Sequence, residues 1–320
     1  DAAGRGPDEW VHGSGWASDG WPDSTAPTAA DLDRVAPHCP VLLDHQIFLH
    51  EAWVNSRALE IAGITAGTPD PPGGRIQRDE QGHPTGILVE EAVKLVSKQI
   101  PPLSTPRLAE AMTKAQALCW QKGLVGLHDL DGAASFRALQ WLHQRGKLGL
   151  RVVKNLPVDL LDQAITLGLQ TGLGDDWLRI GSVKIFADGA LGTRSALLYA
   201  PYGDDPGNLG IAVTEKALML EQAQRASQNG LSLAIHAIGD RAVHRVLDVL
   251  EAVREEEARR GISPDHLRHR IEHLQICPAA DQGRLAPVGV IASMNPVHVP
   301  YDADVVDRIL GERGRFTHAY

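Results

Sequence analysis

Three ionisable side chains close three successive apolar runs of the chain, and their types suit metal-dependent chemistry. Lys184 lies within residues 183–186, His236 ends residues 231–236, and His273 ends residues 270–273. Neutral imidazoles bind zinc and related divalent ions at about 2.0–2.1 Å, and an open position on such an ion activates water. The pattern therefore predicts a divalent metal site, provided that the fold brings the three run ends together.

Lys184 admits three interpretations, because an ammonium group inside a buried strand is costly unless it is paired, neutralised or modified. It could pair with Asp188 or Asp129. A neutral lysine amine could instead form a Schiff base with a carbonyl substrate. A carbamylated lysine would be an anion whose two oxygens can bridge two cations. The residues alone leave all three open.

The two histidines also have an alternative, since a single histidine in a strand is usually a satisfied core residue. Their positions at consecutive strand ends, following Lys184 in order, favour His236 and His273 as metal ligands. Asp240, shortly after His236, is expected to cap the helix that begins there.

The loop after Lys184 is rich in glycine and long for a connection between a strand and a helix. Long loops at the mouth of a barrel usually contact substrate. Arg194 in this loop could clamp a substrate carboxylate or be an ordinary surface arginine. His298 could face the same mouth, and His50 and Trp53 are further candidates for substrate contact.

Short apolar runs alternate with amphipathic segments from about residue 105 onward, which predicts parallel strands joined by right-handed crossovers. The expected strands are 124–127, 150–153, 180–186, 231–235, 267–274 and 288–292, and we expect them to be buried on both faces. The expected helices are 105–121, 133–146, 215–229 and 240–260.

The ends of these strands distinguish a barrel from an open sheet. Four of them end in polar residues, at His128-Asp129, Lys184, His236 and His273. A barrel gathers all carboxyl ends at one mouth, whereas a doubly wound sheet usually has a glycine-rich phosphate loop after its first strand, and no such motif occurs here. The sequence therefore favours a TIM-like (β/α)8 barrel in the α/β class.

Residues 1–104 differ from the remainder in being rich in turn signals. A short helix is expected over residues 51–62, ended by Gly63, and residues 75–78 could pair with 85–88 as a hairpin. We interpret this region as an excursion from the main sheet, so that residues 1–104 precede a partial barrel at 105–320.

The composition excludes several other classes of protein. The chain has 320 residues, 43% of them hydrophobic, and a net charge of −9, which argues against nucleic-acid binding because phosphates need a basic face. The scattered Cys39, Cys119 and Cys277 form no CxxC pair, so no disulfide framework is expected and a reducing cytoplasm is the expected compartment. No apolar run is long enough to span a membrane, and no membrane partner is expected.

Several motifs in order resemble the amidohydrolase 3 branch of the amidohydrolase superfamily, which includes N-substituted formamide deformylases. The segments that carry this resemblance are 53–59, 68–76, 183–192, 235–242 and 268–273. The last three read Val-Lys-Ile-Phe-Ala-Asp-Gly-Ala-Leu-Gly, Ile-His-Ala-Ile-Gly-Asp-Arg-Ala and Arg-His-Arg-Ile-Glu-His. Together they extend over nearly the whole chain.

The resemblance implies a TIM-like barrel of which this chain holds strands 2–7, with residues 1–104 as a long insertion after strand 1. Lys184 would end strand 4, His236 strand 5 and His273 strand 6. These ligands would hold one or two divalent ions, most often zinc, with Lys184 carbamylated. Dimers are common among such barrels, so a homodimer is compatible with the resemblance.

The family pattern also extends beyond this sequence. Its His-X-His motif on strand 1 would precede Asp1, its strand 8 aspartate would follow Tyr320, and the segments of its small β-sandwich would flank both ends. Within the chain, Asn295 stands where relatives tend to carry Gln. We therefore expect these residues to be a portion of a larger enzyme and to be inactive alone.

The implied activity is hydrolysis of an amide-like C–N bond, other than a peptide bond, in a small-molecule substrate by metal-activated water. The aspartate beyond Tyr320 would pass the proton to the leaving nitrogen. A Schiff-base lyase or aldolase that uses Lys184 is one alternative, and a non-catalytic fragment that keeps only the fold is another. The sequence selects no particular substrate.

Overall fold

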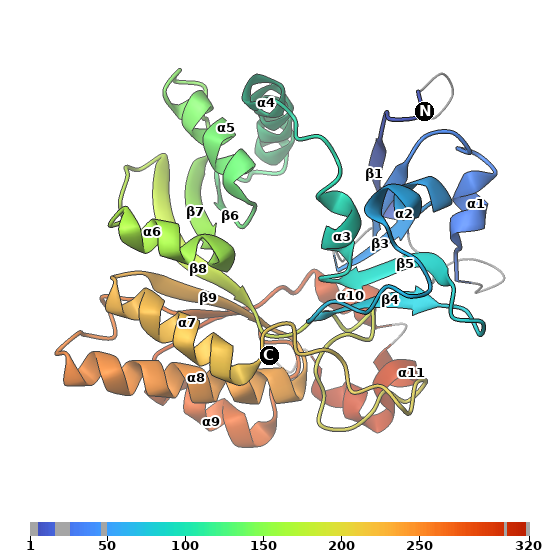
Figure 1. The fold of residues 1–320 in the computed structure, drawn as a ribbon. Coiled ribbons are helices and arrows are strands. Elements are labelled where there is room, and N and C mark those ends of the chain that lie inside the picture. Colours follow the sequence, from blue (N-terminus) through green and yellow to red (C-terminus); the bar gives the residue numbers. More distant parts are fainter. Residues whose placement is uncertain (1–5, 17–25, 46–49, 304–305, 318–320) are drawn as a thin grey trace. The chain divides into compact units, whose positions relative to one another are not determined.

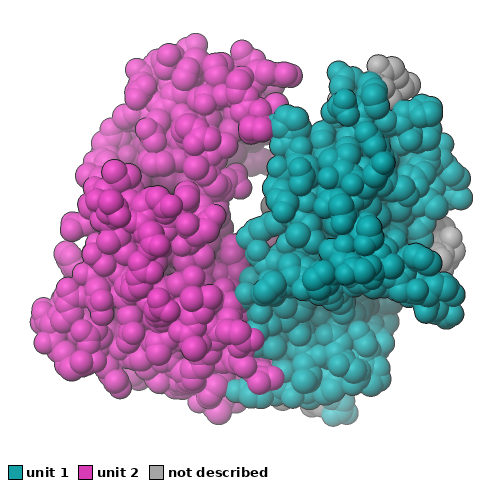
Figure 2. All heavy atoms as spheres, in the orientation of Figure 1, with its two compact units in different colours: residues 1–101, 188–213, 299–315 teal, residues 102–187, 214–298, 316–320 magenta. Residues whose placement is uncertain are grey.

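The chain divides into two compact units in a computed structural model that describes residues 6–16, 26–45, 50–303 and 306–317 (Figures 1 and 2). Unit 1 comprises residues 1–101, 188–213 and 299–315. Unit 2 comprises residues 102–187, 214–298 and 316–320. The chain thus passes back and forth between the units, and the loop that follows Lys184 belongs to unit 1 while Lys184 itself belongs to unit 2.

Unit 2 is built on a six-stranded parallel sheet whose strands are neighbours in chain order (Figure 1). The strands are β6 (Gly126–Asp129), β7 (Arg151–Pro157), β8 (Leu178–Phe186), β9 (Ser232–Ala237), β10 (Arg270–His273) and β11 (Ile291–Ser293). Each predicted strand is present, and each pairs in parallel with the next. The prediction of an α/β fold with parallel strands is therefore confirmed.

Helices precede or connect these strands, and those at 105–121, 133–143, 216–228 and 240–259 lie where the alternating pattern predicted helices. They are α4 (Thr105–Gln121), α5 (Ala133–His143), the 3-10 turn η1 (Val158–Leu160), α6 (Leu161–Thr166), α7 (Lys216–Gln228), α8 (Asp240–Arg259) and α9 (Ala279–Val288). Helix α8 shows why the pattern works: Val243, Val246, Leu247, Leu250 and Val253 recur at helical spacing, and all are buried. Its apolar face packs against β9 and α7.

The parallel sheet is curled, as in half of a barrel. His128 on β6 and Arg270 on β10 approach within 3.3 Å, although three strands separate β6 from β10 in the sheet. In a flat sheet these residues would be about 19 Å apart, at about 4.8 Å per strand. Burial and the positive charge of Arg270 lower the pKa of His128. The side chains of one face therefore converge on a common interior.

The prediction that all six strands are buried on both faces is wrong for the edges of the sheet. Strand β9, near the middle, is buried at every residue, whereas β6 is largely exposed and β11 is partly exposed. β6 and β11 are the outermost strands, and each has a strand neighbour on one side only among the described residues. Burial in a parallel sheet requires neighbours on both sides as well as helices.

Unit 1 contains a five-stranded mixed sheet in the order β1-β2-β3-β5-β4. Its strands are β1 (Val11–Trp16), β2 (Val41–His45), β3 (Glu51–Val54), β4 (Gly74–Arg78) and β5 (Pro84–Glu90). The predicted hairpin is confirmed, since β4 and β5 pair antiparallel. The predicted helix over 51–62 is wrong in its first third, because residues 51–54 form the strand β3 between β2 and β5.

Unit 1 also contains short helices, the first three of which pack against its sheet. They are α1 (Ala29–Asp33), α2 (Ser56–Ala62), α3 (Val93–Ser97), α10 (His298–Asp302), α11 (Val306–Leu310) and the 3-10 segment η2 (Gly311–Phe316). Helix α2 begins where the Asn55 side chain accepts a hydrogen bond from the Ala58 N–H, and it ends at Gly63 in the left-handed conformation, as predicted. The three cysteines are free thiols. Among the described residues, no helix has the length and apolar content to cross a bilayer.

Candidate metal centre

Lys184 lies at the carboxyl end of β8, on the same face as Phe186 two residues later. Lys184 is 3% exposed, and its Nζ lies 4.1 Å from the centroid of the Phe186 ring. The Phe186 ring in turn lies 5.3 Å from the ring of His236, its register partner on β9. The pairing of β8 with β9 therefore brings the predicted lysine and the first predicted histidine to one place.

His236 and His273 are also brought together, at the ends of β9 and β10. Their ring centroids are 4.6 Å apart, and His236 is 1% exposed. A third ring, that of His298, lies 5.6 Å from His273. His273 and Leu274 both have positive φ, +70° and +47°, at the point where β10 ends. Such strained residues cluster at functional sites, because only a well-determined surrounding structure maintains them.

The donor set of this cluster suits a metal ion in part. Two imidazoles that bind one ion at about 2.05 Å have ring centroids about 5 Å apart, which is close to the separation of His236 and His273. Lys184 fits beside a cation only without its positive charge, as a neutral amine or a carbamate. Among the described residues, no group of three or more His, Cys, Asp and Glu side chains is arranged to hold an ion.

The pairing of Lys184 with Asp129, which the sequence left open, is disfavoured by the neighbours of Asp129. The buried Lys154 on β7 donates to the Asp129 carboxylate and to the Asp131 carbonyl, and Ser135 Oγ donates to Asp129 at 2.7 Å. Burial and the charge of Asp129 raise the pKa of Asp131. The polar groups at the end of β6 therefore accept hydrogen bonds from Lys154, a second buried lysine that the sequence analysis did not single out.

Asp240 has a position slightly different from the predicted one. Gly239 is the N-cap of α8, and Asp240 is the first helical residue. Its carboxylate accepts a hydrogen bond from the Arg241 N–H at 2.8 Å. A negative charge in the first turn still stabilises the helix through its dipole.

The other predicted substrate contacts, His50, Trp53 and Arg194, lie in unit 1. Arg194 donates to both carboxylate oxygens of Asp204, at 2.7 Å for the shortest contact, and lowers the pKa of Asp204. Trp53 packs in the core beside Ile87 and donates through Nε1 to the Thr28 carbonyl at 2.8 Å. The structure therefore gives Arg194 and Trp53 clear structural contacts within their own unit.

His50 contacts a residue that sequence reasoning missed. Its Nδ1 lies 2.7 Å from the carboxylate of Glu90, which also accepts a hydrogen bond from Ser195 Oγ at 2.6 Å. Three segments distant in sequence meet here, so no local spacing could have revealed the cluster. The available signal was a carboxylate that closes an apolar strand, at the end of β5.

The opposite end of the parallel sheet contains a different group of buried polar residues. His269 Nε2 lies 2.9 Å from Glu257 Oε1, and its Nδ1 accepts the Leu233 N–H at 3.1 Å. Ser227 Oγ and Arg254 Nη1 also donate to Glu257, at 2.5 and 2.6 Å. Although burial alone would raise it, these donors lower the pKa of Glu257 to about 2.

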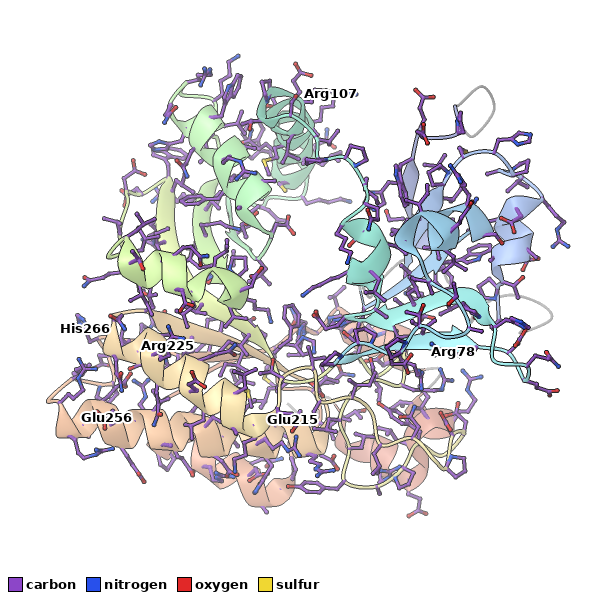
Figure 3. All side chains as sticks on the ribbon, viewed as in Figure 1. Arg78, Arg107, Glu215, Arg225, Glu256 and His266 are labelled. Atoms are coloured by element: carbon purple, nitrogen blue, oxygen red, sulfur yellow. The ribbon has the colours of Figure 1, made fainter. Side chains whose placement is uncertain are left out.

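A cavity of about 360 Å³ lies at this same end, near the ends of α6, α7 and α8. Its lining includes Gly168, Gly230 and His266, and Figure 3 labels His266 there. In barrels this end of the strands contributes stability, whereas chemistry occurs at the carboxyl ends. The candidate centre is therefore the cluster at Lys184, His236 and His273.

A curled parallel sheet with polar residues at its carboxyl ends is the arrangement of barrel-type α/β proteins. Comparison of sequences defines the class further: the profile of the amidohydrolase family matches residues 1–320. The chain belongs to the amidohydrolase family. The resemblance drawn from the motifs is thereby confirmed.

Two relatives illustrate the range of the family. The chain is 36% identical over 323 residues to YtcJ of Bacillus subtilis (strain 168), a protein named as an amidohydrolase, covering 98% of this chain and 58% of the relative. It is 30% identical over 301 residues to the N-substituted formamide deformylase of Arthrobacter pascens, covering 91% of this chain and 54% of the relative. The chain thus spans little more than half the length of these proteins.

A solved structure is similar to nearly the whole chain. A metal-dependent hydrolase from Pyrococcus horikoshii OT3 superimposes with a TM-score of 0.72 at 29% identity, over 99% of this chain and 60% of that one. The fold of this chain therefore matches about three-fifths of that structure.

Proposed function

We propose that the chain is part of a metal-dependent hydrolase of amide-like C–N bonds in small molecules. The observation that carries the proposal is the convergence of Lys184, His236 and His273 at the ends of three neighbouring strands. The family and the hydrolase names of its relatives support it.

In this proposal His236 and His273 would help to hold one or two divalent ions, most often zinc, through neutral imidazoles. Lys184 contributes as a carbamate, because carbamylation replaces a repelling cation by an anion with two donor oxygens. Such an ion, when bound, supplies an acidified water and polarises a carbonyl group. The remaining ligands, a His-X-His pair and an aspartate, are expected from family segments outside residues 1–320.

The side chains of this chain then bind and orient the substrate. His298, beside His273, is proposed to contact it. The family aspartate expected beyond Tyr320 would move the proton to the leaving nitrogen. We further propose that β6 to β11 are strands 2–7 of a TIM-like barrel, with residues 1–104 as the insertion after strand 1.

Metal analysis of the full-length protein tests this proposal. Wild type is expected to retain a stoichiometric divalent metal and to hydrolyse an N-substituted formamide used as a probe. Lys184→Ala and His236→Ala should lose both. His143→Gln is a matched control, because His143 is a partly exposed histidine of α5 bonded to Asp175, and it should lose neither. Full metal content in both site variants would refute the assignment of the ligands.

The Schiff-base alternative makes the opposite prediction for Lys184. Borohydride reduction with a carbonyl substrate would then leave a covalent adduct on Lys184, and activity would survive removal of the metal. If the chain keeps only the fold and has lost the chemistry, even the full-length protein should bind no metal tightly and hydrolyse no probe. The paired imidazoles beside Lys184 favour the hydrolase over both.

A further inference from the structure

Unit 1 contains a pocket of about 270 Å³ on one face of its mixed sheet. All five strands of the sheet contribute to the lining, together with residues of the segment 192–205, and every lining residue belongs to unit 1. The volume is slightly below the range of about 300–1,000 Å³ that is usual for pockets of drug-sized ligands. The pocket therefore suits a smaller molecule, and its existence does not depend on unit 2.

The register of the sheet explains why a charged and an apolar side chain share this pocket. Val89 on β5 pairs with Glu51 on β3 and with Arg75 on β4, the outermost strand (Figure 1). Residues opposite one another on neighbouring strands point to the same face of a sheet. Val89 and Ile87 are buried in one apolar cluster, against which Trp16 packs. The pocket thus combines apolar side chains with a guanidinium group at the edge of the sheet.

Arg75 brings a positive charge to the pocket without a matching negative charge. Its side chain is half-buried, and it forms no hydrogen bond or ion pair within the part of the chain that the structure describes. Although burial opposes it, the hydrogen bond from Arg78 at 2.8 Å and the charges of Arg78 and Arg75 lower the pKa of Asp70. Arg78, and not Arg75, therefore holds that carboxylate.

The segment that follows Arg194 brings the opposite charge to the same pocket. Asp205 is half-buried in the lining, and its carboxylate also has no hydrogen bond or ion pair to any described residue. Its neighbour Asp204 differs, because it pairs with Arg194 at 2.7 Å. The Asp205 N–H donates to the Tyr202 carbonyl at 3.3 Å, so a turn fixes the backbone at Asp205. The pocket therefore contains a cation and an anion that no described side chain pairs with.

A ligand with one charge would meet a group of its own sign in this small pocket. An anion attracted to Arg75 would be repelled by Asp205, and a cation attracted to Asp205 would be repelled by Arg75. We propose that the pocket binds a small zwitterion, with its carboxylate at Arg75 and its ammonium group at Asp205. The apolar side chains of Ile87 and Val89 suit a hydrocarbon body between the two charges. The proposal concerns unit 1 alone and does not rest on the hydrolase function.

Isothermal titration calorimetry of the full-length protein tests the proposal. Three probes, β-alanine, 4-aminobutyrate and 6-aminohexanoate, have a carboxylate and an ammonium group at increasing separations. One of them should bind. The carboxylic acid and the amine of the same chain length should each bind at least about 10-fold more weakly, because each lacks one charge-assisted hydrogen bond.

Two variants show which protein charge holds which group of the ligand. Arg75→Gln should weaken binding of the zwitterion at least about 10-fold, to the affinity of the simple amine, and should leave binding of the amine unchanged. Asp205→Asn should weaken binding of the zwitterion to the affinity of the simple acid. Arg107→Gln and Asp176→Asn are matched controls at exposed residues of unit 2, and they should bind like wild type. Arg75→Met keeps the aliphatic stem and replaces Arg75→Gln if that variant does not fold.

Three results would overturn the proposal. The first is that none of the three zwitterions binds to wild type. The second is that a simple acid or amine binds as tightly as the zwitterion. The third is an unchanged affinity in the Arg75 variant or in Asp205→Asn, since the ligand would then lie elsewhere, for example with its carboxylate on a metal ion. Because the titration measures binding alone, failure of the hydrolase function would leave its outcome unaffected.

Discussion

The two ends of the parallel sheet in unit 2 both bury histidines, but the histidines have very different neighbours. His269 and His273 lie four positions apart in one motif. His269 is completely buried, with hydrogen-bond partners at both ring nitrogens. His273 lies instead in a group of aromatic and imidazole rings at the carboxyl end, with a strained backbone.

The difference shows that burial alone does not distinguish a structural histidine from a candidate ligand. The polar network at Glu257 is internally satisfied, because the hydroxyl of Ser227, the guanidinium of Arg254 and the imidazole of His269 all hydrogen-bond to its carboxylate. Such a network stabilises the fold and has no position left for a ligand. The opposite end brings together two imidazoles, which can bind a metal ion when neutral, and a lysine that could do so only without its positive charge.

The largest effect is expected from His273→Ala at the carboxyl end. In the full-length protein this change should lower metal affinity by at least about 100-fold, since losing a ligand exceeds the effect of losing an outer partner. Metal content after dialysis measures it. The free energy of unfolding of the metal-free protein should change little. If the variant keeps its metal, the carboxyl end is not the metal-binding end of the sheet and the proposed difference between the two ends is wrong.

Glu257→Ala is the matched change at the other end. It should lower the free energy of unfolding by about 3–5 kcal/mol, because it leaves Arg254 and His269 buried without their carboxylate. Denaturant unfolding measures the loss. Metal content per folded molecule should remain at the wild-type level, so a loss of metal here would show that the two ends are coupled.

Acid should destabilise the closed end in a defined range of pH. The pKa of Glu257 falls from 4.5 to about 2 on folding, so its contribution is complete above pH 4.5 and is lost as the pH falls toward 2. The shift corresponds to about 3 kcal/mol. His269 adds a separate loss of stability. Because burial lowers the pKa of His269 in the folded protein, the free energy of unfolding also falls as the imidazole of the unfolded chain protonates below about pH 6.5. In Glu257→Gln the loss between pH 4.5 and 2 should be smaller by that amount.

Ser227→Ala should have the smallest effect. It removes one of several donors to Glu257, so we expect a loss of about 1–2 kcal/mol in unfolding free energy. Thermal unfolding at neutral pH measures it. An effect as large as that of Glu257→Ala would mean that the hydroxyl, and not the ionic pairing, is the main support of the network.

Local periodicity was sufficient to predict most of unit 2 from the sequence. The apolar spacing of α8 and the short runs that became β8 and β9 are local signals, and parallel order follows from their alternation. Strand β3 was mistaken for part of a helix, because four residues cannot distinguish the two periods and its partners β2 and β5 are separate in sequence. The exposure of β6 depends on which strands flank it, which no local pattern contains.

The candidate site was predictable to the same extent. Lys184, His236 and His273 could be grouped because strand ends in a parallel sheet meet at one edge. The contacts of Glu90 and Lys154 could not be predicted from the sequence, because they join side chains from segments up to 105 residues apart. Long-range pairing of polar groups depends on the assembled structure and not on neighbouring residues.

The alternation of the chain between its two units has a practical consequence for cutting it. Unit 2 includes residues on both sides of the 188–213 segment, and unit 1 includes that segment together with residues 1–101 and 299–315. Cleavage after Pro101 would therefore leave unit 1 in two covalently separate pieces, one of them still inserted in the polypeptide of unit 2. Neither unit can be obtained as one uninterrupted stretch of sequence, so limited proteolysis should nick this protein without releasing an intact domain.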